Sequence, residues 1–174
     1  MSVGKQTQGR PTLGQTIASE LRSEATATRK MLERFPAGET DWSPHEKSMT
    51  IGKLANHISD VAGWVEIIVN QEELDFAVSG YEVPEFDTGA KLTGHFDSQV
   101  ETALEVLQNV SDEDLLKTWR LRNGDEIFFE MPRIAVLRGM VMNHLIHHRG
   151  QYSVYLRLKD VPLPSVYGPT ADEQ

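Results

Sequence analysis

The sequence predicts an all-α protein, a four-helix bundle with a short β-hairpin before its last helix. Four segments repeat apolar residues at intervals of three or four positions, the period of an amphipathic helix. Before the last of them, Asn123 and Gly124 separate two stretches, WRLR and DEIFFE, in the pattern of a two-residue hairpin turn. Four long helices in a chain of 174 residues favour one bundle, so we expect a single domain over residues 1–174.

The first two helices are separated by a loop rich in turn-forming residues. The first begins at Pro11 and Thr12 and is ended by Pro36 and Gly38. Its repeating positions are Leu13, Ile17, Leu21, Ala25, Thr28, Leu32 and Phe35. The second ends near Asn70 and repeats at Ile51, Leu54, Ile58, Val61, Val65 and Ile68. Because the second helix is apolar over much of its circumference, we expect it at the centre of the bundle.

The third helix follows a loop containing glycine and proline and ends before Ser111. Its apolar positions, Leu92, Phe96, Val100, Ala103 and Leu107, leave half of its surface for solvent. At the two ends of the chain we expect a flexible segment over residues 1–10 and an extended tail over residues 161–174, which has three prolines and no periodicity. Arg149 and Arg157 are candidates for pairing with acids or for binding this tail.

The hairpin and the fourth helix complete the predicted fold. A type I′ turn at the Asn-Gly dipeptide would place Trp119 opposite Phe128 on the two strands. Pro132 suits the first turn of a helix, and the fourth helix is expected from about Arg133 to Lys159. Its repeating positions are Ile134, Leu137, Val141, His144, His148, Gln151, Tyr155 and Leu158.

Composition and charge exclude several classes of partner. The chain has 17 Lys and Arg against 26 Asp and Glu, a net charge of −9 and no basic run with interleaved aromatic residues, so we expect no nucleic-acid partner. No apolar run reaches the roughly 18 residues of a membrane span, and the N-terminus has no apolar signal segment. With no cysteine, the sequence is consistent with a cytoplasmic location. Any metal must then be held by His, Asp or Glu.

Three of the six histidines lie within five positions of the fourth helix. Because His144 and His148 are four residues apart on its apolar side, their rings can converge on one ion. His147 is rotated from this side by about 100°, which places it at the edge or in solvent. A pair with this spacing can also be two core histidines bonded to backbone or carboxylate groups. A third ligand would decide between these interpretations.

His57 is the best candidate for that third ligand. It shares one side of the second helix with Leu54, Val61, Trp64 and Ile68. Three imidazoles leave coordination positions open for water or substrate, as in catalytic metal sites, and burying them is costly unless an ion satisfies their nitrogens. All-imidazole ligands suit Zn, Ni, Co, Fe or Cu. The other two histidines, His45 and His95, are expected in solvent without a ligand role.

Four further side chains near these histidines have two interpretations each. Asp60, one turn from His57, either orients a ligand imidazole or is an exposed acid. Gln151 either bonds a water at the site or caps a polar pocket. Trp64 and Tyr152 either form walls of the pocket or pack in the core. No Ser-His-Asp order and no glycine-rich phosphate loop is present, so we assign no general base.

Three stretches of the chain carry a family resemblance: WSPHEKSMTIGKLANHI, NHLIHHRGQYSVYLR and VPLPSVYGPTADE. Together they resemble the DinB family, also called the DinB/YfiT-like superfamily, whose members are described as metalloenzymes. HxxxHRGQ followed by YLR, an upstream LAxHI and a PSxYGP tail are specific features, and the resemblance covers most of the chain. It implies a four-helix bundle with a divalent ion, commonly nickel or zinc. Matched position by position, the implied ligands are His57, His144 and His148.

The resemblance also suggests a function. Relatives with assigned activities include transferases and isomerases that use thiols such as bacillithiol, mycothiol or glutathione, so it implies a metal-dependent S-transferase with a small-molecule substrate and a low-molecular-weight thiol. Nickel or zinc is the expected metal, with Fe, Co, Mn and Cu as alternatives. Dimers recur in the family, which implies a homodimer. A metal-dependent hydrolase and a non-catalytic metal or small-molecule binding protein of the stress response remain the alternative functions.

Overall fold

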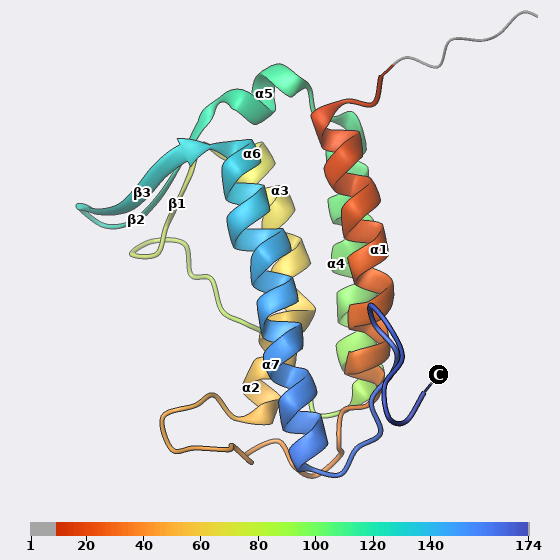
Figure 1. Cartoon of the computed structure of the whole chain (residues 1–174). Helices are drawn as coiled ribbons and strands as arrows, with labels where there is room; N and C mark the ends of the chain where they lie inside the picture. Colours follow the sequence, from red (N-terminus) through yellow and green to blue (C-terminus); the bar gives the residue numbers. More distant parts are fainter. Residues whose placement is uncertain (1–9, 174) are drawn as a thin grey trace, which may run out of the picture.

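A computed structural model describes residues 10–173 and shows a mostly helical protein with a small three-stranded sheet (Figure 1). The helical segments are α1 (Leu13–Glu33), α2 (Ile51–Asp60), the 3-10 turn η1 (Val61–Gly63), α3 (Trp64–Asn70), α4 (Gly89–Asn109), α5 (Asp112–Leu116), α6 (Arg133–Val136), the π-helical segment η2 (Leu137–Asn143) and α7 (His144–Leu158). The strands are β1 (Glu73–Asp75), β2 (Thr118–Asn123) and β3 (Glu126–Pro132). Residues 1–9 of the expected flexible N-terminus lie outside the described part of the chain.

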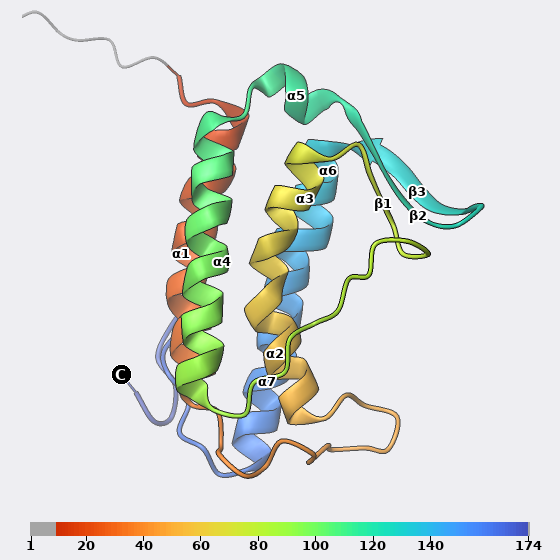
Figure 2. The same ribbon diagram turned by 180° about the vertical axis from the view of Figure 1, so that it is seen from behind.

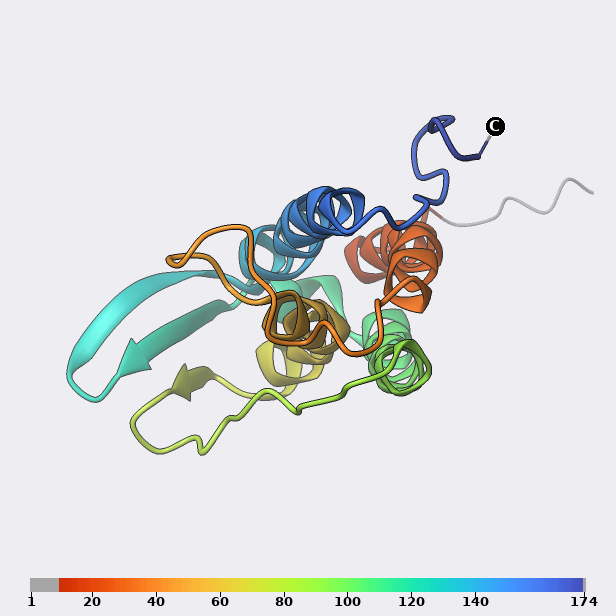
Figure 3. The same cartoon turned by 90° about the horizontal axis from the view of Figure 1, so that it is seen from below.

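The long helices lie side by side, and the sheet extends from one end of them (Figures 1 and 2). Viewed along the helices, α1, α4, α2 with α3, and α7 surround a common interior (Figure 3). This interior holds most of the apolar side chains expected on the inner faces of the four segments, including Leu21, Leu54, Phe96 and Leu137. In the last turns of α7 the expected face is wrong, because Leu158 is exposed and Leu156 is buried instead. Within residues 10–173, no helix is both long enough and apolar enough to cross a membrane.

Helix α1 begins as expected and packs closely on α4. Thr12 caps it, because the Thr12 side chain accepts from the N–H of Gln15 while the Gln15 side chain accepts from the N–H of Thr12. Near this end, a Cβ on Gly14 would lie 2.3 Å from the carbonyl oxygen of Leu107 in α4. Only glycine therefore allows the two backbones to approach so closely at this crossing.

The second predicted helix is central, as expected, but it is not continuous. Its apolar residues Leu54, Ile58, Val61, Val65 and Ile68 are at most 2% exposed. The helix tightens into the 3-10 turn η1 after Asp60 and resumes as α3. Short 3-10 segments change the direction of neighbouring side chains, because they have fewer residues per turn than an α-helix.

The fourth predicted helix has the expected bounds, within one residue, but contains a π-helical segment. Helix α6 begins at Arg133, and α7 ends at Leu158. Between them, η2 runs from Leu137 to Asn143 and ends directly before His144. A π-helical turn is wider than an α-helical turn and is frequent at functional sites.

The hairpin exists, but its predicted register is wrong. Asn123 pairs with Glu126, so the two residues of the turn are Gly124 and Asp125 rather than Asn123 and Gly124. Gly124 has a φ of +59°, a conformation that glycine adopts without strain. The N–H of Gly124 donates to the Asp75 carboxylate at 2.9 Å, so a contact from β1, distant in sequence, holds the turn in this position.

An irregularity in the ladder moves the register further. The pairing shifts between Leu121 and Arg122, because Arg122 pairs with Ile127 and Leu121 pairs with Phe129. Phe128 is therefore the extra residue of a β-bulge. Trp119 lies opposite Met131 instead of Phe128. The bulge and the displaced turn together explain the error.

Two short elements were not expected from the sequence. Strand β1 pairs in parallel with β2, which makes the sheet three-stranded with the order β1-β2-β3. Helix α5 is capped by Ser111, and acidic side chains occupy its first turn, where they interact favourably with the helix dipole. Both elements have five residues or fewer, too few to show a period in the sequence.

The C-terminal tail is without helix or strand from residue 161 to residue 173, as expected, and it lies against α1 and α7 (Figures 1 and 3). Arg157 pairs with Asp172 in the tail. Arg149 is buried, pairs with Glu24 of α1 at 2.7 Å and donates to the Tyr167 hydroxyl at 2.6 Å. Both arginines therefore pair with acids and bind the tail, as the sequence suggested.

Arg133 is a buried cation that joins three elements. Its guanidinium donates to the carbonyl oxygens of Ile68, Gln71 and Asp114, at 2.9, 2.9 and 3.2 Å. These acceptors belong to the end of α3, the residue after it and α5. Carbonyls at the C-terminal end of a helix have no intrahelical donors, so Arg133 supplies bonds that the backbone cannot.

We expect Arg133→Met to lower the free energy of unfolding by about 2–4 kcal/mol, because it leaves buried acceptors without donors. Arg22→Met, at an exposed position of α1, is the control and should change stability by less than about 0.5 kcal/mol. Urea unfolding followed by circular dichroism measures both. Equal stability of the two variants would contradict the assigned role of Arg133.

Candidate metal centre

The structure brings His57, His144 and His148 together in the interior of the helical body. His57 comes from α2, and the other two come from the first two turns of α7. The Nε2 atoms of His57 and His144 are 3.1 Å apart, and those of His144 and His148 are 2.7 Å apart. One ring nitrogen of each residue lies within 4.8 Å of the other two. The rings of His57 and His144 are half-buried, and His148 is 7% exposed.

The outer nitrogens of the two α7 histidines fix how the rings are protonated. Nδ1 of His144 lies 3.2 Å from the carbonyl oxygen of Met140, which can only accept, so this nitrogen donates its proton. Nδ1 of His148 lies 2.7 Å from Oε1 of Gln151, which also accepts. In the neutral rings, both Nε2 atoms therefore present lone pairs to the centre of the cluster.

This arrangement fits a divalent cation. Two unprotonated Nε2 atoms 2.7 Å apart repel each other and cannot form a hydrogen bond. Nitrogens that share one ion at ~2.0–2.1 Å lie ~2.9–3.4 Å apart for angles of ~90–109°, which is close to the observed spacings. An ion among the three rings would offset the repulsion between the two α7 nitrogens and could also bind Nε2 of His57, which lies 3.1 Å from Nε2 of His144. The three histidines could thus hold a metal ion and leave further coordination positions open.

Burial keeps the three imidazoles neutral. Burial, followed by the nearby His144 and His148, lowers the pKa of His57 from 6.5 to about 4. Burial is also the main cause that lowers the pKa of His144 and of His148. Neutral imidazole is the form that binds metals, so the cluster is ready to bind at neutral pH without first losing protons.

An aromatic side chain encloses one side of the cluster. The Trp64 ring packs edgewise against the rings of His57 and His144, with centroids 5.9 and 5.4 Å apart. Its Nε1–H donates to the Tyr81 hydroxyl at 2.7 Å, and Tyr81 in turn donates to Asp60. Trp64 is therefore a wall of the site, held in place by hydrogen bonds.

Asp60 and His95 differ from their sequence predictions. Asp60 is buried rather than exposed, and within residues 10–173 it makes no hydrogen bond to a cluster histidine. The second carboxylate oxygen of Asp60 lies 3.0 Å from Nε2 of His95. His95 is half-buried, whereas the sequence predicted it in solvent. The pairing of Asp60 with His95 and Tyr81 explains both errors. Tyr81 lies in a loop without periodicity, and no sequence signal indicated its role.

The structure also places the remaining residues that the sequence singled out near the site. His45 and His147 are exposed, as expected. Gln151 bonds the His148 ring directly, a role that neither of its two interpretations anticipated. Tyr152 is fully buried in the core, and its hydroxyl has no hydrogen-bond partner in the described part of the chain.

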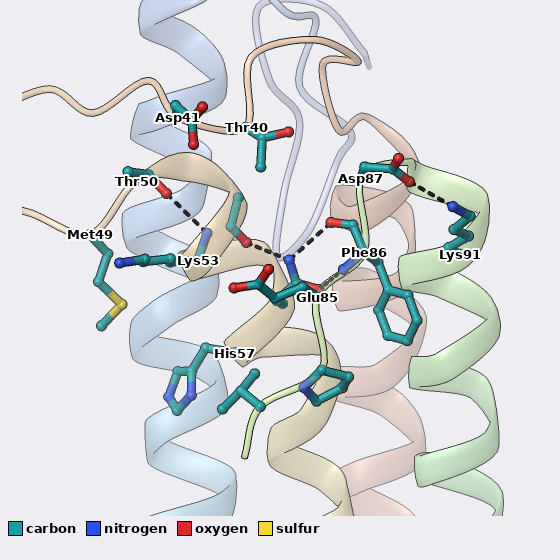
Figure 4. Close-up of a pocket in the computed structure, with 14 residues that line it drawn as sticks. Thr40, Asp41, Met49, Thr50, Lys53, His57, Glu85, Phe86, Asp87 and Lys91 are labelled. Carbon is teal, nitrogen blue, oxygen red and sulfur yellow. Dashed lines mark hydrogen bonds and ion pairs between the residues drawn. The ribbon is translucent and has the colours of Figure 1, made fainter.

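A cavity of about 580 Å³ lies beside His57 (Figure 4). One wall is the segment between β1 and α4, which Asn56 holds through the backbone of Phe86. The Asn56 side chain donates to the Phe86 carbonyl at 3.0 Å and accepts from its N–H at 2.7 Å. The lining residues are Thr40, Asp41, Met49, Thr50, Gly52, Lys53, Asn56, His57, Val83, Pro84, Glu85, Phe86, Asp87 and Lys91.

We expect His57→Ala, His144→Ala and His148→Ala to reduce the metal content of zinc-loaded protein from about one ion per chain to less than about a tenth of that, because two imidazoles hold the ion much more weakly than three. His147→Ala is the matched control and should keep its metal. Elemental analysis after removal of free zinc measures the content, with circular dichroism to verify folding. Full metal content in a folded His57→Ala variant would contradict the site.

The metal-free protein should lose stability as the pH falls from about 6.5 towards 4. In that window the unfolded chain takes up a proton on His57 and the folded chain does not, so protonation favours unfolding. Above about pH 6.5, His57 is neutral in both the folded and the unfolded chain, so its protonation no longer lowers the free energy of unfolding. Urea unfolding at about pH 7.5, 5.5 and 4.5 measures it, with His57→Asn showing a smaller fall. Identical pH dependence in the two proteins would refute this assignment.

Comparison with known proteins is consistent with this fold. The chain is 24% identical over 162 residues to the uncharacterized protein YrdA of Bacillus subtilis (strain 168), a match that covers 91% of this chain and 92% of YrdA. The crystal structure of the DinB-like protein YjoA from Bacillus subtilis aligns with a TM-score of 0.68 at 21% identity, over 88% of this chain and 99% of YjoA. A DinB-like protein from Bacillus cereus ATCC 10987 aligns with a TM-score of 0.66 at 23% identity, over 87% and 95%.

The family follows from a match over nearly the whole chain. A sequence model of the DinB family matches residues 5–174, which include all three cluster histidines, the cavity lining and the tail. Both structural neighbours are DinB-like proteins. This protein therefore belongs to the DinB family.

Proposed function

We propose that this protein is a metal-dependent S-transferase, in which His57, His144 and His148 hold a divalent ion, nickel or zinc, and a low-molecular-weight thiol is the nucleophile. The observation that carries the proposal is the convergence of three neutral imidazoles beside a cavity of about 580 Å³. Three protein ligands leave room for a substrate atom, which distinguishes catalytic from structural metal sites.

The size of the cavity supports a small-molecule substrate. Binding sites for small molecules usually measure ~300–1,000 Å³, and this cavity is in the middle of that range. The net charge of −9 argues against nucleic acid as an alternative substrate. His57 lines the cavity (Figure 4), so a ligand bound there would contact one of the three cluster histidines.

A bound divalent ion would supply a Lewis acid that favours the deprotonated form of a thiol at neutral pH. In the reaction, the thiol releases its proton to solvent and its sulfur attacks an electrophilic carbon. A carbon–sulfur bond forms, and the leaving group departs with the electron pair of the broken bond. Gln151 and the Met140 carbonyl keep the two α7 imidazoles in the required tautomer, while Trp64 excludes water from one side.

The test is turnover of a chlorodinitrobenzene by zinc- or nickel-loaded protein, with and without added thiols. We expect chloride release and thioether formation only when a thiol is present, and a loss of about 100-fold or more in His57→Ala, with His147→Ala unchanged. A panel of thiols and electrophiles extends the search for the substrate. Turnover that needs the metal but no thiol would indicate hydrolysis instead, and turnover in metal-free protein would contradict a metal-dependent reaction.

The homodimer and the cytoplasmic location belong to the same proposal and rest on the family resemblance and on the absence of cysteine. Light scattering coupled to gel filtration tests the first. A mass close to twice 19.6 kDa would support the dimer, and a mass close to 19.6 kDa would contradict it.

A further inference from the structure

The cavity beside His57 contains one cation without a carboxylate partner. Of its two lysines, Lys91 pairs with Asp87 at 2.9 Å. Lys53 takes part in none of the ion pairs found among residues 10–173. Its ammonium is therefore available to a ligand in the cavity.

Lys53 lies on the same helix as His57, one of the three proposed metal ligands. Lys53 and His57 are four residues apart on α2, so their Cβ atoms are about 5–6 Å apart on one face of the helix. Figure 4 shows both side chains leaving α2 on the same side. A group bound at Lys53 would thus be about one helical turn from an atom bound at the cluster.

The Lys53 side chain, and not the backbone, supplies the hydrogen-bond donor for an anion at this end of α2. The N–H groups of Ile51, Gly52 and Lys53 are bonded to the Trp42 carbonyl, the Thr40 carbonyl and the Thr50 hydroxyl. None of these first-turn donors is free for a ligand.

Two acids limit how much negative charge the cavity accepts. Asp41 and Glu85 line it, and neither takes part in an ion pair among residues 10–173. Their repulsion disfavours a ligand with several negative charges. A ligand with one anionic group, placed at Lys53, suits this distribution.

We propose that the substrate of this site carries a single anionic group of the carboxylate type, which Lys53 binds about one helical turn from the metal. The inference rests on the proposed function and narrows its substrate class from small thiols to anionic ones. Lys53 is then a specificity-determining residue: it selects the substrate without contributing a ligand to the metal.

The test uses cobalt-loaded full-length protein, whose absorption bands change when a ligand reaches the ion. Mercaptopropionate and its methyl ester are titrated into the wild type, Lys53→Gln and Lys47→Gln. These two thiols differ in the carboxylate charge and in one methyl group, and Lys47 is an exposed lysine outside the cavity lining. We expect the preference for the acid over the ester to fall at least about threefold in Lys53→Gln and to stay unchanged in Lys47→Gln. Chelation of cobalt by the acid is equal in all three proteins and cancels in this comparison.

Failure of the inference and failure of the proposed function give different results. An acid preference that is the same in Lys53→Gln and the wild type would overturn the inference about Lys53. If neither thiol changes the cobalt bands, the thiol chemistry is wrong, and the same titrations with succinate and monomethyl succinate test Lys53 through an oxygen ligand. A Lys53-dependent preference for succinate would then support the anion site, and its absence would overturn it.

Discussion

The convergence of three neutral imidazole rings in a half-buried interior is the constraint on which the rest of the site depends. The unprotonated Nε2 atoms of His144 and His148 repel each other unless a cation lies between them. The surrounding structure maintains this arrangement from several directions. Gln151 and the Met140 carbonyl fix the outer ring nitrogens, and Trp64 packs against two of the rings. The segment bound by Asn56 forms one wall of the cavity beside His57.

The helical class of the fold could be predicted because long helices repeat their apolar residues over many turns. The same period could not reveal local departures from α-helical geometry. The π-helical segment before His144 and the 3-10 turn after Asp60 depend on how the helices pack, and their residues continue the apolar pattern. The hairpin register failed for a related reason. The Asp75 carboxylate, about 50 residues away in the chain, binds the N–H of Gly124, and no local pattern contains that contact.

The three histidines of the site could be found from the sequence because each lies on the inner face of a strongly periodic helix. Their environment could not be found in this way. Tyr81 and the cavity wall lie in a segment without periodicity, and their positions depend on hydrogen bonds from Tyr81 to Asp60 and Trp64 and between Phe86 and Asn56. Asp60 itself was misjudged because carboxylates are usually exposed, and only the folded structure supplies the partners that permit its burial.

The most direct test of a metal centre built from the three histidines is X-ray absorption spectroscopy at the metal edge of protein loaded with zinc or nickel. We expect three imidazole nitrogens at ~2.0–2.1 Å, recognisable by the scattering of the outer ring atoms, with at least one further light ligand from solvent. Addition of a thiol should replace that ligand with sulfur at ~2.3 Å. A spectrum without imidazole scattering, or one with a shell of oxygen ligands alone, would contradict a metal centre built from His57, His144 and His148.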